Sequence, residues 1–84
     1  MKVEIFTPGG ALGALEAKAL VAPASEGQLG VLDHHAPMLA SLSSGKLIIR
    51  GPQGDSEYDI DGGVLQVVDG NVTVLTERAT LRDK

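Results

Sequence analysis

Glycine recurs throughout this chain and divides it into short apolar runs about as long as a β-strand. The runs are rich in Val, Leu and Ile, and the segments between them are turn-like. This spacing is typical of small all-β folds. We therefore predict a small antiparallel two-sheet β-sandwich with no long helix. The glycines are Gly9, Gly10, Gly13, Gly27, Gly30, Gly45, Gly51, Gly54, Gly62, Gly63 and Gly70.

Several of these runs have clear strand patterns. In the first of them, Val3 and Ile5 share one face, because side chains alternate across a strand. Asp69 and Gly70 separate two β-branched runs, and an Asp-Gly pair in that setting is a strong hairpin signal. The predicted strands are Lys2–Phe6, Lys46–Arg50, Ser56–Ile60, Val64–Val68 and Val72–Leu75.

The segment Ala11–Ala22 is ambiguous. It is rich in good helix formers, so propensity alone favours a helix. It also alternates, with Ala17, Ala19 and Val21 on one face and Glu16, Lys18 and Leu20 on the other. Periodicity does not choose between helix and strand.

Length and composition restrict the class of protein. A chain of 84 residues and 8.7 kDa forms one domain, 1–84, and the absence of Cys excludes disulfides and thiolate metal sites. The net charge is −4 without a basic cluster, which argues against nucleic-acid binding. No apolar run is long enough to span a bilayer, and Met1–Glu4 leads directly into a strand. We expect a soluble protein from a reducing compartment.

Two groups of polar residues invite a chemical interpretation. Four acids recur at every second residue from Asp55 to Asp61, which predicts a solvated strand face; a calcium loop starting at Glu57 would need a Glu where Val68 stands. Asp33, His34 and His35 lack a third ligand nearby, and we expect an exposed polar corner. No residues form a catalytic set, a cofactor site or a metal site.

The segment Ala36–Leu42 is crowded with apolar residues after Pro37. An exposed Met and Leu patch often indicates a partner surface. The same residues could instead complete the core, and the sequence leaves both possibilities open.

Two blocks carry a resemblance to a known family. Ser25–Leu39 has a tight Gly turn over Ser25–Gly30, a short apolar strand and a corner closed by Pro37. Asp61–Ala79 has the form of a hairpin. Together they resemble the N-terminal β-sandwich domain of the F-type ATP synthase epsilon subunit. The matching residues are Ser25, Glu26, Gly27, Gly30, Leu32, His35, Ala36, Pro37, Leu39, Gly62, Gly63, Leu65, Val67, Val72, Thr73, Val74, Leu75 and Ala79.

The resemblance implies a non-catalytic rotor part. Such a domain packs against the gamma subunit, rests on the polar loops of the c-ring and couples proton-driven ring rotation to ATP synthesis. It works at the cytoplasmic side of a bacterial inner membrane, or at a thylakoid or other energy-transducing membrane. Relatives continue into a C-terminal helical hairpin that restrains ATP hydrolysis, whereas this sequence stops before it. We therefore expect inhibition by that hairpin to be missing.

The resemblance also assigns roles to particular segments. The family has a long strand where this chain has Ala11–Ala22, so we expect a strand there. Asp33 and His34 replace the family's usual Pro-Gly, which should change the stiffness of the corner. The residues expected to face the c-ring are Glu26, Gln28 and His35, and those expected to face gamma are Met38, Leu39 and Leu42. The alternative is a free-standing β-sandwich that binds a ligand or acts as an enzyme.

Overall fold

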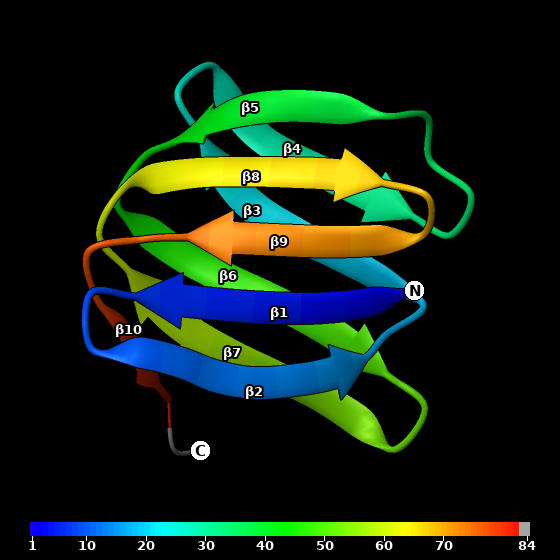
Figure 1. Ribbon diagram of the computed structural model, residues 1–84, viewed down its shortest axis with the longest axis horizontal. Helices are drawn as coiled ribbons and strands as arrows, with labels where there is room; N and C mark the ends of the chain where they lie inside the picture. The colour runs from blue at the N-terminus through cyan, green and yellow to red at the C-terminus, as the bar shows by residue number, and fades with distance from the viewer. Residues whose placement is uncertain (83–84) are drawn as a thin grey trace.

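The chain folds into two packed β-sheets, as the computed structural model of residues 1–82 shows (Figure 1). The strands are β1 (Lys2–Thr7), β2 (Gly10–Glu16), β3 (Ala19–Ala24), β4 (Gly27–Leu32), β5 (Met38–Leu42), β6 (Gly45–Gly51), β7 (Gly54–Ile60), β8 (Gly63–Val68), β9 (Asn71–Leu75) and β10 (Ala79–Leu81). The predicted all-β sandwich is confirmed. The predicted domain also included Asp83 and Lys84, which lie outside the described residues.

The two sheets are stacked as layers, and hydrogen bonds between β3 and β5 join them into one continuous strand order. The front sheet of Figure 1 has the order β5-β8-β9-β1-β2, and the back sheet has the order β4-β3-β6-β7-β10. The layers meet at one residue pair, Ala24 opposite Leu42. Most neighbouring strands are antiparallel as predicted, but β1 runs parallel to β9.

The core lies between the two sheets and is built from aliphatic side chains. Val3 and Ile5 point inward, as their alternation predicts, and burial of each such side chain stabilises the fold by about 1.5–3 kcal/mol. The buried apolar residues are Val3, Ile5, Ala17, Leu20, Ala22, Val31, Leu42, Leu47, Ile49, Ile60, Leu65, Val67, Val72 and Val74.

We predicted one strand over Ala11–Ala22, and this is wrong, because the segment contains parts of two strands, β2 and β3. The chain leaves the front sheet at the end of β2 and enters the back sheet at β3. Between them, Ala17 N–H donates to the Met1 carbonyl (2.8 Å) and Lys18 N–H donates to the Arg50 carbonyl (2.9 Å). This bend resets the alternation: Ala17 is buried at the bend, whereas Leu20 and Ala22, from the other of the two expected faces, are buried in β3.

Both predicted turns form, but one is shorter than expected. Only Ser25 and Glu26 turn the chain, and Gly27–Leu32 continues as β4, antiparallel to β3. The β8–β9 hairpin turns at Asp69 and Gly70, with φ values of 49° and 78°. Positive φ at both positions is the requirement of a type I′ turn, which confirms the predicted hairpin.

Candidate interaction surfaces

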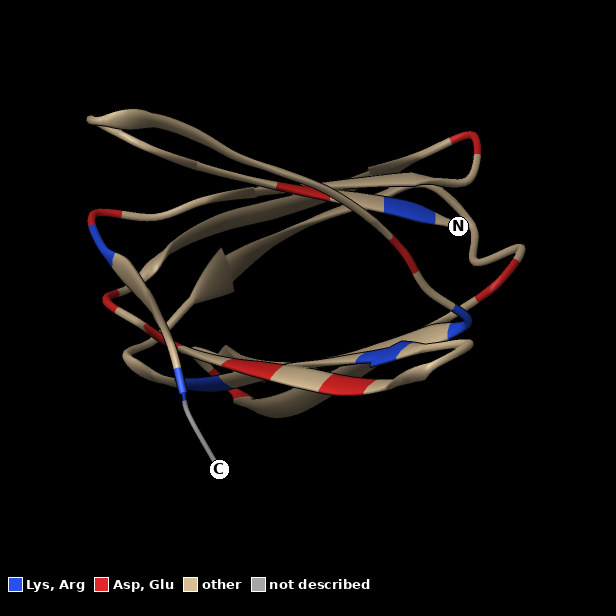
Figure 2. Cartoon of the chain, turned by 90° about the horizontal axis from the view of Figure 1, so that it is seen from below, with Lys and Arg blue, Asp and Glu red and all other residues tan. Residues whose placement is uncertain are grey.

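The outer face of the back sheet is a ladder of ion pairs (Figure 2). Three of the four acids of the predicted strand face lie on β7, beside cations of β6 and of the segment after β10, whereas Asp61 follows the end of the strand. The pairs are Lys46–Glu57 (3.6 Å), Arg50–Asp55 (2.7 Å) and Arg82–Asp59 (3.6 Å). Within residues 1–82, no three His, Asp or Glu side chains are grouped so as to hold a metal ion. No helix in that range could cross a membrane.

The outer face of the front sheet carries both polar residues, such as Gln66 and Thr73, and exposed apolar ones. Leu39 is 72% exposed and Leu75 48% exposed. In the strand register Val64 lies opposite Leu75, and Leu75 lies beside Phe6. Three neighbouring strands therefore present an apolar row at one end of this sheet.

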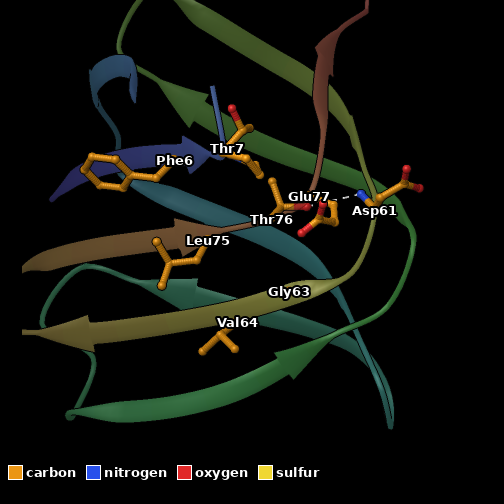
Figure 3. Close-up of a pocket in the computed structure, with 9 residues that line it drawn as sticks. Phe6, Thr7, Asp61, Gly63, Val64, Leu75, Thr76 and Glu77 are labelled. Atoms are coloured by element: carbon orange, nitrogen blue, oxygen red, sulfur yellow. Dashed lines mark hydrogen bonds between the residues drawn. The ribbon is translucent and has the colours of Figure 1, made fainter. Parts of the chain in front are cut away.

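This row forms one side of a surface hollow of about 470 Å³ (Figure 3). Phe6, Pro8, Val64 and Leu75 supply apolar walls. Asp61, Thr76 and Glu77 line its polar side. A hollow with this lining can take one large, mainly apolar side chain from another protein.

The hollow depends on a close approach between β8 and β9. Gly63 has a φ of 119°, and a Cβ atom built there would lie 1.8 Å from the carbonyl oxygen of Leu75. Only glycine allows the two backbones to meet in this way. The Gly62 and Gly63 pair that matched the family therefore has a structural function, which is to bring the chain from the back sheet into the front sheet.

A hydrogen-bonded corner closes the polar side of the hollow. Thr76 Oγ1 accepts from Asp61 N–H (3.2 Å) and donates to the Arg78 carbonyl (3.3 Å). The guanidinium of Arg78 donates twice to Asp61 Oδ2, from Nε (3.1 Å) and a terminal nitrogen (2.8 Å). This hydrogen bonding and the charge of Arg78 lower the pKa of Asp61. Ser44 Oγ, from the turn between β5 and β6, donates to Asp61 Oδ1 (3.4 Å).

The three residues predicted to face the c-ring do not lie together. Glu26 is in the β3–β4 turn and Gln28 is near the start of β4, whereas His35 follows the other end of β4. Six strand residues separate the two ends, a span of roughly 20 Å. Glu26 instead shares a second hollow, of about 400 Å³, with Leu29 and Leu39.

The three residues predicted to face gamma differ in exposure. Leu39 is largely exposed, and Met38 is half-buried against the core. Leu42 is only 6% exposed and belongs to the core, so it has little surface to offer a partner, contrary to our expectation. The segment is extended, and alternate side chains point inward.

The sequence did not point to Phe6, Val64 or Thr76. Val64–Val68 and Val72–Leu75 each contain one polar residue, and alternation around Gln66 and Thr73 was the signal that could have placed Val64 and Leu75 on the outer face. The register given by the Asp69–Gly70 turn contained that information, since it sets Val64 opposite Leu75.

The Asp33 and His34 corner has an unusual backbone. His34 has a φ of 65°, a left-handed conformation, at the position where the family usually has glycine. Asp33 Oδ1 lies 2.7 Å from the Met1 amino nitrogen. This hydrogen bond lowers the pKa of Asp33 and raises the pKa of the amino group.

Known proteins are similar to this chain in sequence. The epsilon chain of the ATP synthase of Ruegeria sp. (strain TM1040) is 34% identical over 84 residues, which are 100% of this chain and 61% of that protein. The chloroplastic epsilon chain of Cyanidioschyzon merolae is 37% identical over 79 residues, 94% of this chain and 60% of the relative. The chain thus spans less than two thirds of the length of these relatives.

A solved structure has the same fold. A chain in the cryo-EM structure of the Euglena gracilis mitochondrial ATP synthase, OSCP/F1/c-ring in rotational state 1, superposes with a TM-score of 0.83 at 25% identity, over 94% of this chain and 51% of that one. The sequence model of the ATP synthase Delta/Epsilon chain β-sandwich domain matches residues 1–82. This chain therefore belongs to the family of ATP synthase Delta/Epsilon chain β-sandwich domains.

Proposed function

We propose that this chain is a non-catalytic central-stalk domain of a proton-translocating F-type ATP synthase. It links the gamma subunit to the c-ring and thereby couples ring rotation to ATP synthesis. It lies at the cytoplasmic side of a bacterial inner membrane or on the matching side of another energy-transducing membrane. Family membership and the epsilon-chain relatives support this function over a free-standing ligand-binding or enzymatic sandwich.

The contrast between the two outer faces carries the proposal. The back sheet carries ion pairs on its outer face, whereas one end of the front sheet exposes Val64 and Leu75 beside Phe6, around the hollow. Contiguous exposed apolar surface of this kind marks a protein interface. In our proposal gamma covers the front sheet, and the Glu26 end of β4 reaches the polar loops of the c-ring.

Substitution of Leu75 by Gln tests the gamma contact. Loss of an anchoring side chain costs about 1–2 kcal/mol of binding, so capture of gamma should weaken roughly tenfold. Because Leu75 is half-exposed, the folded domain should persist. Leu81→Gln is the matched control, since Leu81 is similarly exposed but lies on β10 of the back sheet. Binding is measured by titration with gamma, and equal affinities of both variants would assign gamma to another face.

A further inference from the structure

The front-sheet hollow contains a carboxylate without a partner among the residues that the structure describes. Glu77 lines the hollow, and within residues 1–82 no ion pair or side-chain hydrogen bond holds its carboxylate. The other carboxylate there, that of Asp61, already receives hydrogen bonds from Arg78 and Ser44. The charge of Glu77 is therefore available to another molecule.

The backbone on both sides of Glu77 is anchored. Thr76 N–H donates to the Phe6 carbonyl (3.0 Å), and the Thr76 hydroxyl is bonded within the corner. On the other side, the Arg78 guanidinium is held by its two hydrogen bonds to the Asp61 carboxylate. Figure 3 shows Glu77 next to Thr76, to one side of the apolar row and toward Asp61. The backbone that carries Glu77 is therefore fixed before any partner arrives, and this part of the entropic cost of binding is already met by folding.

An apolar wall that ends in a carboxylate matches one kind of side chain. Lys and Arg have an apolar stem and a cationic end, and they bury the stem while the charge stays near the surface. Phe6, Val64 and Leu75 provide the wall for such a stem, and Glu77 provides the acceptor for a charge-assisted hydrogen bond.

We propose that this hollow binds a Lys or Arg side chain of the gamma subunit and that Glu77 is a specificity-determining residue of the contact. The inference rests on the gamma contact proposed above. Partial removal of water by the apolar wall strengthens such a pair beyond that of a fully exposed one.

The isosteric variant Glu77→Gln removes the charge and keeps the shape. The full chain is titrated against an ATP synthase core that contains gamma and has been depleted of this chain. We expect about tenfold weaker binding for Glu77→Gln and a shallower dependence of the affinity on salt, as for loss of a close interfacial charge pair. The matched control is Asp69→Asn, which changes the net charge equally in the turn at the opposite end of the front sheet. Asn tolerates the positive φ of that position.

The binding results for the two variants distinguish a direct contact of Glu77 from long-range attraction. Weakening by Glu77→Gln but not by Asp69→Asn supports the contact, and a carbodiimide cross-link from Glu77 to a gamma lysine would identify a Lys occupant. Equal weakening by both variants indicates only long-range attraction and overturns the inference. Unchanged affinity of Glu77→Gln also overturns it while the proposed function stands. If the unmodified chain fails to bind the core, the proposed function itself is wrong. The inference that a gamma side chain occupies the hollow is then also wrong.

Discussion

Gly63 is the glycine of this chain at which an added Cβ atom would clash most severely with its surroundings. Gly63→Ala would place a methyl group against the Leu75 carbonyl in a backbone conformation that alanine disfavours. We expect the free energy of unfolding to fall by about 2–4 kcal/mol, the size of effect that severe steric strain produces. Chemical denaturation followed by circular dichroism measures the loss.

Gly30 provides the control for this substitution. A Cβ at Gly30 meets nothing within 4 Å, and its φ lies outside the left-handed range. Gly30→Ala should change stability by less than about 0.5 kcal/mol. A similar loss in both variants would mean that the contact with Leu75 is not what requires glycine at position 63.

Single residues also show what the sequence could and could not reveal. Replacement of the family's Pro-Gly by Asp33 and His34 was visible, but the left-handed backbone of His34 was not, since non-glycine residues rarely adopt it. Leu39 and Leu42 are chemically identical, yet one is exposed and the other buried. Their difference depends on the phase of β5, and the signal for that phase was a single polar residue, Ser41, which shares the exposed face with Leu39.

At the scale of elements, the corner between β7, β8 and β10 should respond to pH. Arg78 lowers the pKa of Asp61 below its ordinary value of 3.8, so ionised Asp61 stabilises the folded state. That stabilisation is complete above the unfolded pKa and is lost as the pH falls through the lower folded pKa. Asp61→Asn should therefore be less stable than the unmodified chain at pH 7, and the difference should shrink below about pH 4.

Denaturant titrations between pH 7 and pH 2.5 measure this difference. Asp33 also has a lowered pKa, but it titrates alike in both proteins and cancels in the comparison. Asp69→Asn, which removes the same charge outside this corner, serves as the reference. A gap between Asp61→Asn and the unmodified chain that persists undiminished at pH 2.5 would assign the effect to something other than the charge of Asp61.

The bounds of two consecutive strands could be predicted where a turn sequence separates them. They could not be predicted where the strands are separated only by a bend. The Asp69–Gly70 hairpin carries its own signal, and β8 and β9 were found within one residue of their bounds. The passage from β2 to β3 has no glycine or proline, and the hydrogen bonds that fix it come from Met1 and Arg50, distant in sequence. Local propensity contains no information about such partners, so the two strands were predicted as one.

For the whole molecule, the separation of Glu26 from His35 determines how the domain can meet the c-ring. Because these residues lie at opposite ends of β4, one compact contact cannot include both. We expect Glu26→Cys and Gln28→Cys to cross-link to ring loops in the assembled complex. His35→Cys should join them only if β4 lies lengthwise along the ring, and cross-linking of His35→Cys alone would reverse the proposed orientation.

The parallel pairing of β1 with β9 also affects how the chain reaches its native state. Lys2 pairs with Asn71 and Phe6 with Leu75, so the first strand to be synthesised waits for almost the whole chain before it gains its second neighbour. Closing so long a loop before its contacts form slows folding, and β-rich chains of this kind fold in roughly milliseconds to seconds. Until β9 arrives, Val3 and Ile5 lack half of their cover. While β9 is still inside the ribosome, β1 therefore exposes apolar side chains to which a chaperone could bind.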